Sequence, residues 1–279
     1  MPRSINTLFF STLFIFCAAV HPGRAVSAPT GYSNNEVSPP LLTAGIFRIE
    51  SERSYKLSLQ VALGILNTQS ISDRDQSLML IARARKDLAK VTDKTSKTTK
   101  AFSRVNAALD DQMNALPKLT ASTASATYDI NEDLLNKLNF LSFALEAETN
   151  DTASRIVGLA LRQASLAQRM AKIVLLRSVD KSLAAKQGLQ VDLAQSIIEF
   201  TNGLALLTQE AGSDRLLKDR VVLAQSQWVF YQTALAPKVN SSNNLRDIST
   251  TSDRIAELMV EIVRLGYALP PDPGLYAGR

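Results

Sequence analysis

Two segments of the chain, 116 residues apart, carry basic side chains in a shared pattern. The first reads AGIFRIESERSYK from Ala44 to Lys56, and the second reads ALRQASLAQRMAK from Ala160 to Lys172. Identical positions pair Ala44 with Ala160, Arg53 with Arg169 and Lys56 with Lys172, and Glu52 opposite Gln168 is a near match. Arginine carries a planar, permanently charged guanidinium group whose forked donors suit a small planar oxyanion. Arginines at these positions could therefore contact a small oxyanion.

Helical spacing separates the arginines of the two segments. Arg48 and Arg53 lie five residues apart, which at roughly 100° per residue places them about 140° apart around a helix. Arg162 and Arg169 lie seven residues apart and so share one stripe. That stripe borders an apolar one where a neighbouring helix would pack. The members of the apolar stripe are Leu159, Leu166, Met170 and Ile173.

Chemistry that needs cysteine or histidine is confined to the start of the chain. Cys17 and His21 are the only residues of their types, and both lie in a segment that we interpret below as a cleavable export signal. Without them the chain has no disulfide, no Cys/His metal or haem site, no cysteine nucleophile and no histidine-based triad. Carboxylate, lysine and tyrosine side chains remain, but no grouping of them forms a recognisable site. We therefore predict a protein that is not an enzyme and has no metal or cofactor.

Both segments resemble the first-helix signature of the NarX/PilJ-like family of nitrate- and nitrite-sensing domains, found at the N-terminus of NarX and of type IV pili methyl-accepting chemotaxis transducers. The signature is close to A-G-x-x-R-M-x-S-x-R-x-x-K, and the first segment matches it at Ala44, Gly45, Arg48, Ser51, Arg53 and Lys56. The second resembles the PilJ form, A-G-R-Q-R-M-L-S-Q-R-M-A-K, at Ala160, Arg162, Gln163, Leu166, Gln168, Arg169, Met170, Ala171 and Lys172. Trp228 and Phe230 fall where the family has an aromatic helix late in the domain.

The resemblance implies two tandem copies of a periplasmic four-helix bundle whose first-helix arginines bind nitrate or nitrite between paired copies. Arg48 matches the principal nitrate-contacting arginine of the family, and Arg53 matches the second. The corresponding positions of the second copy are Ala164 and Arg169, so the two copies are not equivalent. The candidate ligand-binding residues are therefore Arg48, Arg53, Arg162 and Arg169.

Two arrangements of such a site remain open. In an intramolecular pseudo-dimer, a single asymmetric site combines Arg48 with Arg162 or Arg169 of the other copy. In a homodimer, two Arg48 side chains from separate chains meet instead.

Each of these residues also has a structural explanation. Arg48 precedes Glu52 by four residues, the spacing of a surface ion pair. Arg53 and Arg169 can order a bundle by pairing with an acid on the next helix, and Gly45 can permit close helix approach. Aromatic residues at helical spacing usually fill a bundle core, which is the prediction for Trp228, Phe230 and Tyr231.

The elements that position these side chains are helices. From Leu41 onward the chain has little Gly or Pro, and its apolar residues recur at spacings of three and four. We predict helices at 41–67, 72–94, 95–117, 130–148, 152–181, 188–210, 213–236 and 247–266. Turn chemistry at Ser70 to Asp73, Thr120 to Tyr128, Gly212 to Asp214 and Ser241 to Asn244 separates them. Short connections predict an all-α fold of two tandem antiparallel four-helix bundles, at 41–148 and 152–266, followed by a Pro-rich tail at 267–279.

The first 28 residues have the pattern of a signal peptide. Arg3 precedes the apolar run Leu8 to Val20, and Ala25 and Ala28 offer cleavage points. The run is shorter than the roughly 20 residues of a membrane-spanning helix. Residues 29–40 resemble a flexible leader, and Pro39-Pro40 suits the first turn of a helix. Cleavage would release a soluble periplasmic protein, whereas an uncleaved segment would anchor the chain in the membrane.

The remaining charge is only mildly basic. Removal of Arg3 and Arg24 from the 31 basic residues leaves 29 against 26 acidic ones. No dense basic run is present, so we predict no nucleic-acid partner. We expect a soluble periplasmic sensor or accessory module that binds nitrate or nitrite and acts through a membrane receptor or transporter. The alternative is a helical scaffold that binds no ligand and makes protein contacts at the cell envelope.

Overall fold

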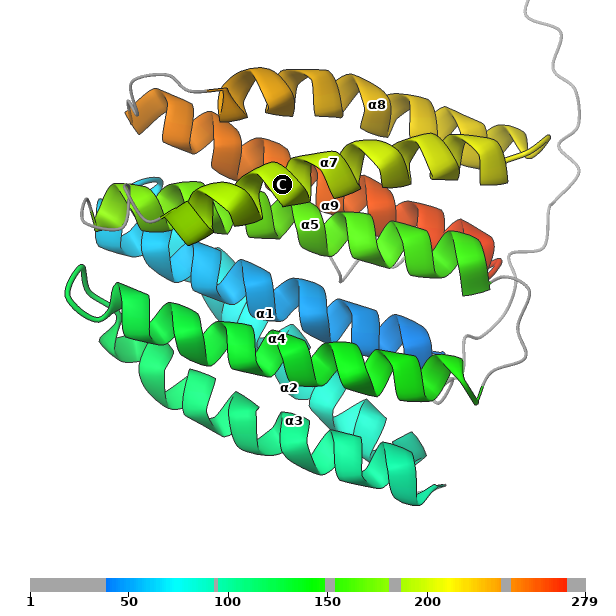
Figure 1. The fold of residues 1–279 in the computed structure, drawn as a ribbon, viewed down its shortest axis with the longest axis horizontal. Helices are drawn as coiled ribbons and strands as arrows, with labels where there is room; N and C mark the ends of the chain where they lie inside the picture. Colours follow the sequence, from blue (N-terminus) through cyan, green and yellow to red (C-terminus); the bar gives the residue numbers. More distant parts are fainter. Residues whose placement is uncertain (1–38, 93–94, 149–153, 181–186, 237–241, 270–279) are drawn as a thin grey trace, which may run out of the picture. The chain divides into compact units, whose positions relative to one another are not determined.

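The computed structural model describes residues 39–92, 95–148, 154–180, 187–236 and 242–269 (Figure 1). Within these ranges the chain is all helical, which confirms the predicted fold class. The signal peptide at 1–28, most of the leader and the tail beyond Leu269 lie outside the described residues.

Helices in the described ranges fall into two successive groups of four. The first group is α1 (Pro40–Leu63), α2 (Asn67–Val91), α3 (Ser96–Ala115) and α4 (Ala124–Glu146). The second group is α5 (Ser154–Val179), α7 (Gln187–Glu210), α8 (Arg215–Leu235) and α9 (Ser242–Gly266).

Local chemistry fixes several helix ends. Pro40 occupies the first position of α1, where its missing N–H costs no hydrogen bond. Thr95 and Asp214 cap α3 and α8, because each side chain accepts a hydrogen bond from a backbone N–H of the first turn. Gly64 ends α1 in the left-handed conformation, with φ of 68°, a region that glycine enters without steric cost.

Two predicted breaks are wrong. Ser70 to Asp73 lies inside α2, because the chain turns earlier, at Gly64 to Leu66. The run from Thr120 to Tyr128 ends its turn at Thr123, and α4 begins at Ala124 instead of residue 130. The Ser and Thr residues of this run are tolerated in a helix whose buried face starts at Ala124 and Thr127, since tertiary packing outweighs weak local preference.

Packing groups the helices as two four-helix sets that meet along α1 and α5. In the first set, α1 packs against α2 and α4, and α3 packs against α4. In the second set, α5 packs against α7 and α9, and α8 packs against α9. Extensive contact between α1 and α5 then joins the sets, as Figure 1 shows for the blue and green helices at the centre.

Glycine at one position lets α1 and α5 approach closely. A Cβ atom on Gly45 would lie 2.5 Å from Leu161 Cδ2. Leu161 stands 116 residues after Gly45, so equivalent positions of the repeat face one another. Contacts farther along both helices, such as Glu52 with Arg169, keep nearly the same offset, and the two helices therefore run parallel.

As the central helix of the first set, α1 is enclosed on all sides. Between Leu41 and Gln60, Arg48 is the one residue that is not buried. Even Glu50, Glu52, Arg53 and Lys56 are at most 1% exposed. Because charges are costly to bury without partners, the surroundings of these side chains decide what the repeated motif does.

Candidate functional site

Arg48 opens onto a cavity between α1, α4 and α5. The cavity has a volume of about 240 Å³, well above the roughly 10–15 Å³ that a single water needs. Its lining residues are Leu41, Gly45, Arg48, Asn139, Ser142, Phe143, Glu146, Gly158, Leu159, Leu161 and Arg162. Gly45 and Gly158, which have no side chain, form part of its wall.

Arg48 has a hydrogen-bond donor in this region that is not used. One guanidinium nitrogen, Nη1, donates to Asn139 Oδ1 at 3.1 Å. Nε is enclosed and has no hydrogen-bond partner among the described residues. Burial lowers the pKa of Arg48, Glu52 partly opposes this, and the charges of Arg162 and Arg169 lower it further. The group is therefore a half-buried cation with one enclosed, unused donor.

The predicted surface pair between Arg48 and Glu52 is not formed. Glu52 is 1% exposed and turns toward α5, where it forms an ion pair with Lys172 Nζ. Arg169 Nη1 lies 3.8 Å from the other oxygen of Glu52. Within the described residues, Arg48 consequently has no carboxylate at ion-pair distance.

Arg162 reaches the same cavity from α5, but it has an acidic partner. Its Nη2 donates to Glu199 Oε2 on α7 at 2.8 Å. Two further ion pairs join the same two helices. Arg155 lies 3.0 Å from Glu210, and Arg169 lies 3.7 Å from Asp192. The structure thus brings Arg48 and Arg162 together, with Glu199 balancing Arg162.

Two cavity residues were not identified from the sequence. Asn139 holds Arg48, and Glu146 lines the cavity near the end of α4. Burial raises the pKa of Glu146 above its ordinary value, which eases its protonation. No spacing rule connects α4 to the repeated motif, because their contact arises only from helix packing.

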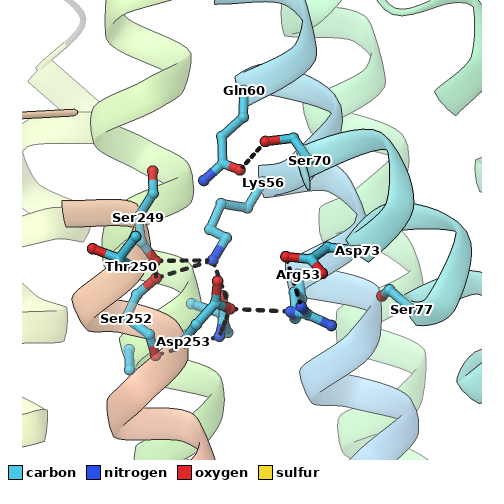
Figure 2. A network of polar contacts seen from close by, with 12 residues as sticks. Arg53, Lys56, Gln60, Ser70, Asp73, Ser77, Ser249, Thr250, Ser252 and Asp253 are labelled. Carbon is cyan, nitrogen blue, oxygen red and sulfur yellow. Dashed lines mark hydrogen bonds and ion pairs between the residues drawn. The ribbon is translucent and has the colours of Figure 1, made fainter. Parts of the chain in front are cut away.

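Arg53 and Lys56 lie outside this cavity, in a network that we call the α9 cluster (Figure 2). Arg53 Nε donates to Asp253 Oδ1 on α9 at 3.0 Å, and Nη1 donates to Glu50 at 3.3 Å. Lys56 Nζ lies 2.8 Å from the same Asp253 oxygen and donates to Ser252 Oγ at 3.1 Å. Both basic side chains are fully buried.

Arg169 and Lys172 form a matching network, the α4 cluster. Arg169 Nη1 donates to Glu132 Oε2 on α4 at 2.8 Å. Lys172 Nζ donates to Glu132 Oε1 at 2.6 Å and to Asn131 Oδ1 at 2.8 Å, and it also pairs with Glu52. Like the α9 cluster, this network joins a repeated Arg-Lys pair to one acid on the fourth helix of the other set.

Both shared acids stay ionised at neutral pH. Burial alone would raise the pKa of Asp253, but Lys56 and Arg53 outweigh it and lower that pKa. In the same way, Lys172 and Arg169 outweigh burial and lower the pKa of Glu132 to about 2. The repeated cations therefore join the two helix sets through ion pairs that are buried or half-buried.

A search of the described residues finds no group of His, Cys, Asp and Glu side chains arranged to hold a metal ion. In the same ranges, no helix is both long and apolar enough to span a membrane. Comparison with protein families, characterised proteins and solved structures gives no match for this chain.

Proposed function

We propose that the chain binds a small oxyanion, nitrate or nitrite first, in the Arg48 cavity, and that it serves in the periplasm as a sensor or accessory module. In this proposal Arg48 is the principal ligand, and Arg162, whose charge Glu199 balances, lines the site from α5. A partner protein, such as a membrane receptor or transporter, responds to the occupied state.

The supporting observation is that Arg48 has no acidic partner within the described part of the chain. Arg53, Lys56, Arg162, Arg169 and Lys172 each pair with a carboxylate, whereas Arg48 has only the amide of Asn139 and an enclosed Nε without an acceptor. A small anion beside Arg48 would accept the unused hydrogen bond and neutralise the half-buried charge. Guanidinium donors in a fork match the planar oxygens of nitrate.

The proposed site is single and asymmetric. Ala164 stands where the second copy would carry a counterpart of Arg48, and it is fully buried. Leu161, the counterpart of Gly45, fills space against that glycine. One copy thus supplies the principal arginine and the other supplies a wall of the cavity together with Arg162.

Anion binding at Arg48 could affect the junction of the two helix sets through α1, over one helical turn. Glu52, four residues after Arg48, belongs to the α4 cluster that joins the two helix sets. An anion beside Arg48 would offset the electrostatic attraction between Arg48 and Glu52. In this proposal a change at the cavity alters the balance of charge at the junction of the sets, which a partner protein can detect.

The test is thermal unfolding of the purified protein with nitrate, nitrite, chloride and sulfate. At 100 times its dissociation constant, a ligand stabilises a protein by about 2.7 kcal/mol, which corresponds to a rise in Tm of about 5–10 °C for a chain of this size. We expect a selective rise with nitrate or nitrite that Arg48→Ala abolishes. Arg83→Ala, at a largely exposed arginine on α2, is the matched control and should keep the full response.

Other results of this experiment would change the proposed function or the position of the binding site. Absence of a selective response to either anion would refute the oxyanion proposal and favour the scaffold function. A nitrate response that survives Arg48→Ala would retain anion binding but place it elsewhere. Each variant is compared with its own unliganded Tm, because loss of the bond to Asn139 can shift stability by itself.

A further inference from the structure

A second cavity lies between α1, α2 and α9, beside the α9 cluster. It has a volume of about 360 Å³, within the roughly 300–1,000 Å³ of small-molecule sites. It shares no lining residue with the Arg48 cavity, and all of its lining residues except Leu66 are polar. In Figure 2, Ser70 of α2 lies on one side of it and Thr250 of α9 on the other. A polar cavity of this size is a candidate site for a small polar molecule.

The two helix sets can be compared at this place, because their helices correspond position by position. Arg53 lies 3.6 Å from Asp73 on α2, and Arg169 lies 3.7 Å from Asp192 on α7. Buried residues of α2 and α7 correspond at the same offset of 119 residues. They are Ser70, Ser77, Ile81, Ala84 and Leu88 on α2, matched by Leu189, Ser196, Phe200, Gly203 and Leu207 on α7.

An aromatic ring occupies the corresponding place in the other set. Positions of α4 and α9 correspond at an offset of 121 residues, because Glu132 and Asp253 are the shared acids of the two clusters. Tyr128 is therefore the counterpart of Ser249. Lys172 Nζ lies 5.1 Å from the centre of the Tyr128 ring, whereas Ser249 has no ring and borders the cavity.

Leucines replace two further polar residues at the counterpart positions. Leu176 stands where the first copy has Gln60, and Leu189 stands where it has Ser70. Both leucines belong to the hydrophobic core. Two leucines and a tyrosine therefore satisfy helix packing at this place, so packing alone does not explain polar residues around an open cavity.

The side chain of Gln60 has an unused donor at the cavity. Gln60 is 2% exposed, and its Oε1 accepts a hydrogen bond from Ser70 Oγ at 2.8 Å. Its amide nitrogen has no hydrogen-bond partner in the described part of the chain, and Figure 2 shows that nitrogen turned away from Ser70. A buried donor without an acceptor is unfavourable, so an acceptor on a bound molecule would stabilise this arrangement.

Carboxylates dominate the charges of the cavity wall. Asp73, Asp253 and Glu257 line it together with one basic residue, Arg254, which is 60% exposed and lies 3.4 Å from Glu257. The basic side chains of the α9 cluster lie behind Asp253 and do not line the cavity. Burial raises the pKa of Glu257, and the charge of Asp253 raises it further. A positive charge on a bound molecule would therefore be favourable at this wall.

We propose that this cavity is a second binding site, for a small organic molecule with an ammonium group and a neighbouring hydrogen-bond acceptor. The ammonium group would lie beside Asp73 and Glu257, since charge-assisted hydrogen bonds to carboxylates are strong. The acceptor, a hydroxyl or carbonyl oxygen, would take the unused N–H of Gln60. An anion would meet like charges here and is disfavoured. The site therefore differs from the Arg48 cavity in the charge of the ligand that it selects.

Isothermal titration of the purified protein tests this site. The probes are ethanolamine and propylamine, which carry an ammonium group, and ethylene glycol and acetate, which do not. We expect ethanolamine to bind with a Kd of about 1 mM or tighter, and the two compounds without an ammonium group not to bind. Asp73→Asn should raise the ethanolamine Kd at least about tenfold. Asp75→Asn, at a side chain of α2 that is 63% exposed, is the matched control and should leave the Kd unchanged.

A bulky side chain at the cavity wall tests the position of the site without changing a charge. Thr250 lines the cavity but is itself exposed, so Thr250→Trp should block the cavity while the fold is retained. We expect this variant to lose ethanolamine binding. Thr201→Trp, at an exposed threonine of α7, is the control and should bind ethanolamine normally. Circular dichroism of each variant checks that the helices are retained.

Gln60→Leu tests the contact with the acceptor, because it copies Leu176 of the other set and removes the donor. In the wild type, ethanolamine should bind more tightly than propylamine, which has no acceptor for the Gln60 amide. Gln60→Leu should remove this preference. A preference that survives Gln60→Leu would overturn the assignment of the acceptor to Gln60.

Three results would overturn the proposal as a whole. These are no binding of either amine, equally tight binding of ethylene glycol, and ethanolamine binding that both Asp73→Asn and Thr250→Trp leave unchanged. Arg48→Ala should keep ethanolamine binding, since Arg48 does not line this cavity. Nitrate does not enter these experiments, so their outcome is independent of the proposed oxyanion site.

Discussion

Arg48 and Glu146 share one cavity, and their chemistry makes anion binding sensitive to pH. Burial raises the pKa of Glu146, so its neutral form persists to higher pH than that of an exposed carboxyl group. A negative charge on Glu146 repels a bound anion, whereas its neutral form does not. The carboxyl group therefore adjusts the affinity of the proposed site.

We predict that nitrate affinity rises as pH falls through the raised pKa of Glu146. Glu146→Gln should keep the higher affinity at all pH values and remove this dependence. Isothermal titration across the pH range from 4 to 8 measures both effects, because arginine stays charged throughout. An identical pH profile for the wild type and Glu146→Gln would contradict the assignment.

The shared acids of the two clusters control acid stability. Glu132 has its pKa lowered to about 2 from an ordinary 4.5, so its ionised form stabilises the folded state. That contribution is complete above pH 4.5 and is lost as pH falls toward 2. The same sign applies to Asp253, whose pKa is also lowered.

Glu132→Gln should reduce the free energy of unfolding by about 3 kcal/mol at pH 7, because it leaves Lys172 and Arg169 without their main partner. The loss relative to wild type should shrink as pH falls below 4.5. Urea unfolding at pH 7 and pH 3 tests this difference. Asp133→Gln on the same helix is the control, since Asp133 is exposed. An equal loss at both pH values would refute the ion-pair explanation.

At the scale of single residues, the repeated motif indicated which arginines matter but not what each one contacts. Arg48, Arg53 and Arg169 have the same residue type in similar local sequences. Their environments differ because of the helices that pack beside them. α9 places Asp253 beside Arg53, and α4 places Glu132 beside Arg169, whereas Arg48 lines a cavity. These acids lie far from the motif along the chain, so no local pattern connects them to it.

At the scale of helices, the approach of α1 to α5 depends on Gly45. An added methyl group would lie 2.5 Å from Leu161 Cδ2, so the side chain or the helix must shift. Gly45→Ala should therefore destabilise the fold by about 1–3 kcal/mol, the usual cost of overpacking. Leu161→Ala in the same chain should recover part of this loss. Thermal unfolding of the single and double variants gives the coupling energy, and purely additive effects would contradict direct contact.

Periodicity predicted the helices well and their surroundings less well. The eight α-helices of the described ranges follow from composition and spacing, as does the start of α1 after Pro39. Ser70 to Asp73 was misassigned as a turn because its polar residues fit a turn as well as an exposed helix face. Phe230 was misassigned to the core because spacing does not show which side of a helix meets a neighbour.

At the scale of the molecule, the two helix sets are bound into one unit. α1 is the central helix of the first set, and it is also the surface on which α5 packs. The α9 and α4 clusters then cross between the sets in both directions. Separating the sets would expose the apolar contact of α1 with α5 and would take Asp253 from Arg53 and Lys56 and Glu132 from Arg169 and Lys172. Of these four basic side chains, all but Arg169 are fully buried.

We therefore predict that the protein unfolds in a single cooperative transition. Exposure of α1 or α5 costs apolar burial, and isolated buried charges are strongly unfavourable, so neither set should persist after the other has unfolded. Differential scanning calorimetry should give a van't Hoff enthalpy close to the calorimetric one. Weakening the α9 cluster with Asp253→Asn should lower the single Tm without splitting the peak, although the change lies between the sets. Two resolved transitions in the wild type would show instead that each four-helix set is stable alone and that the ion pairs only align them.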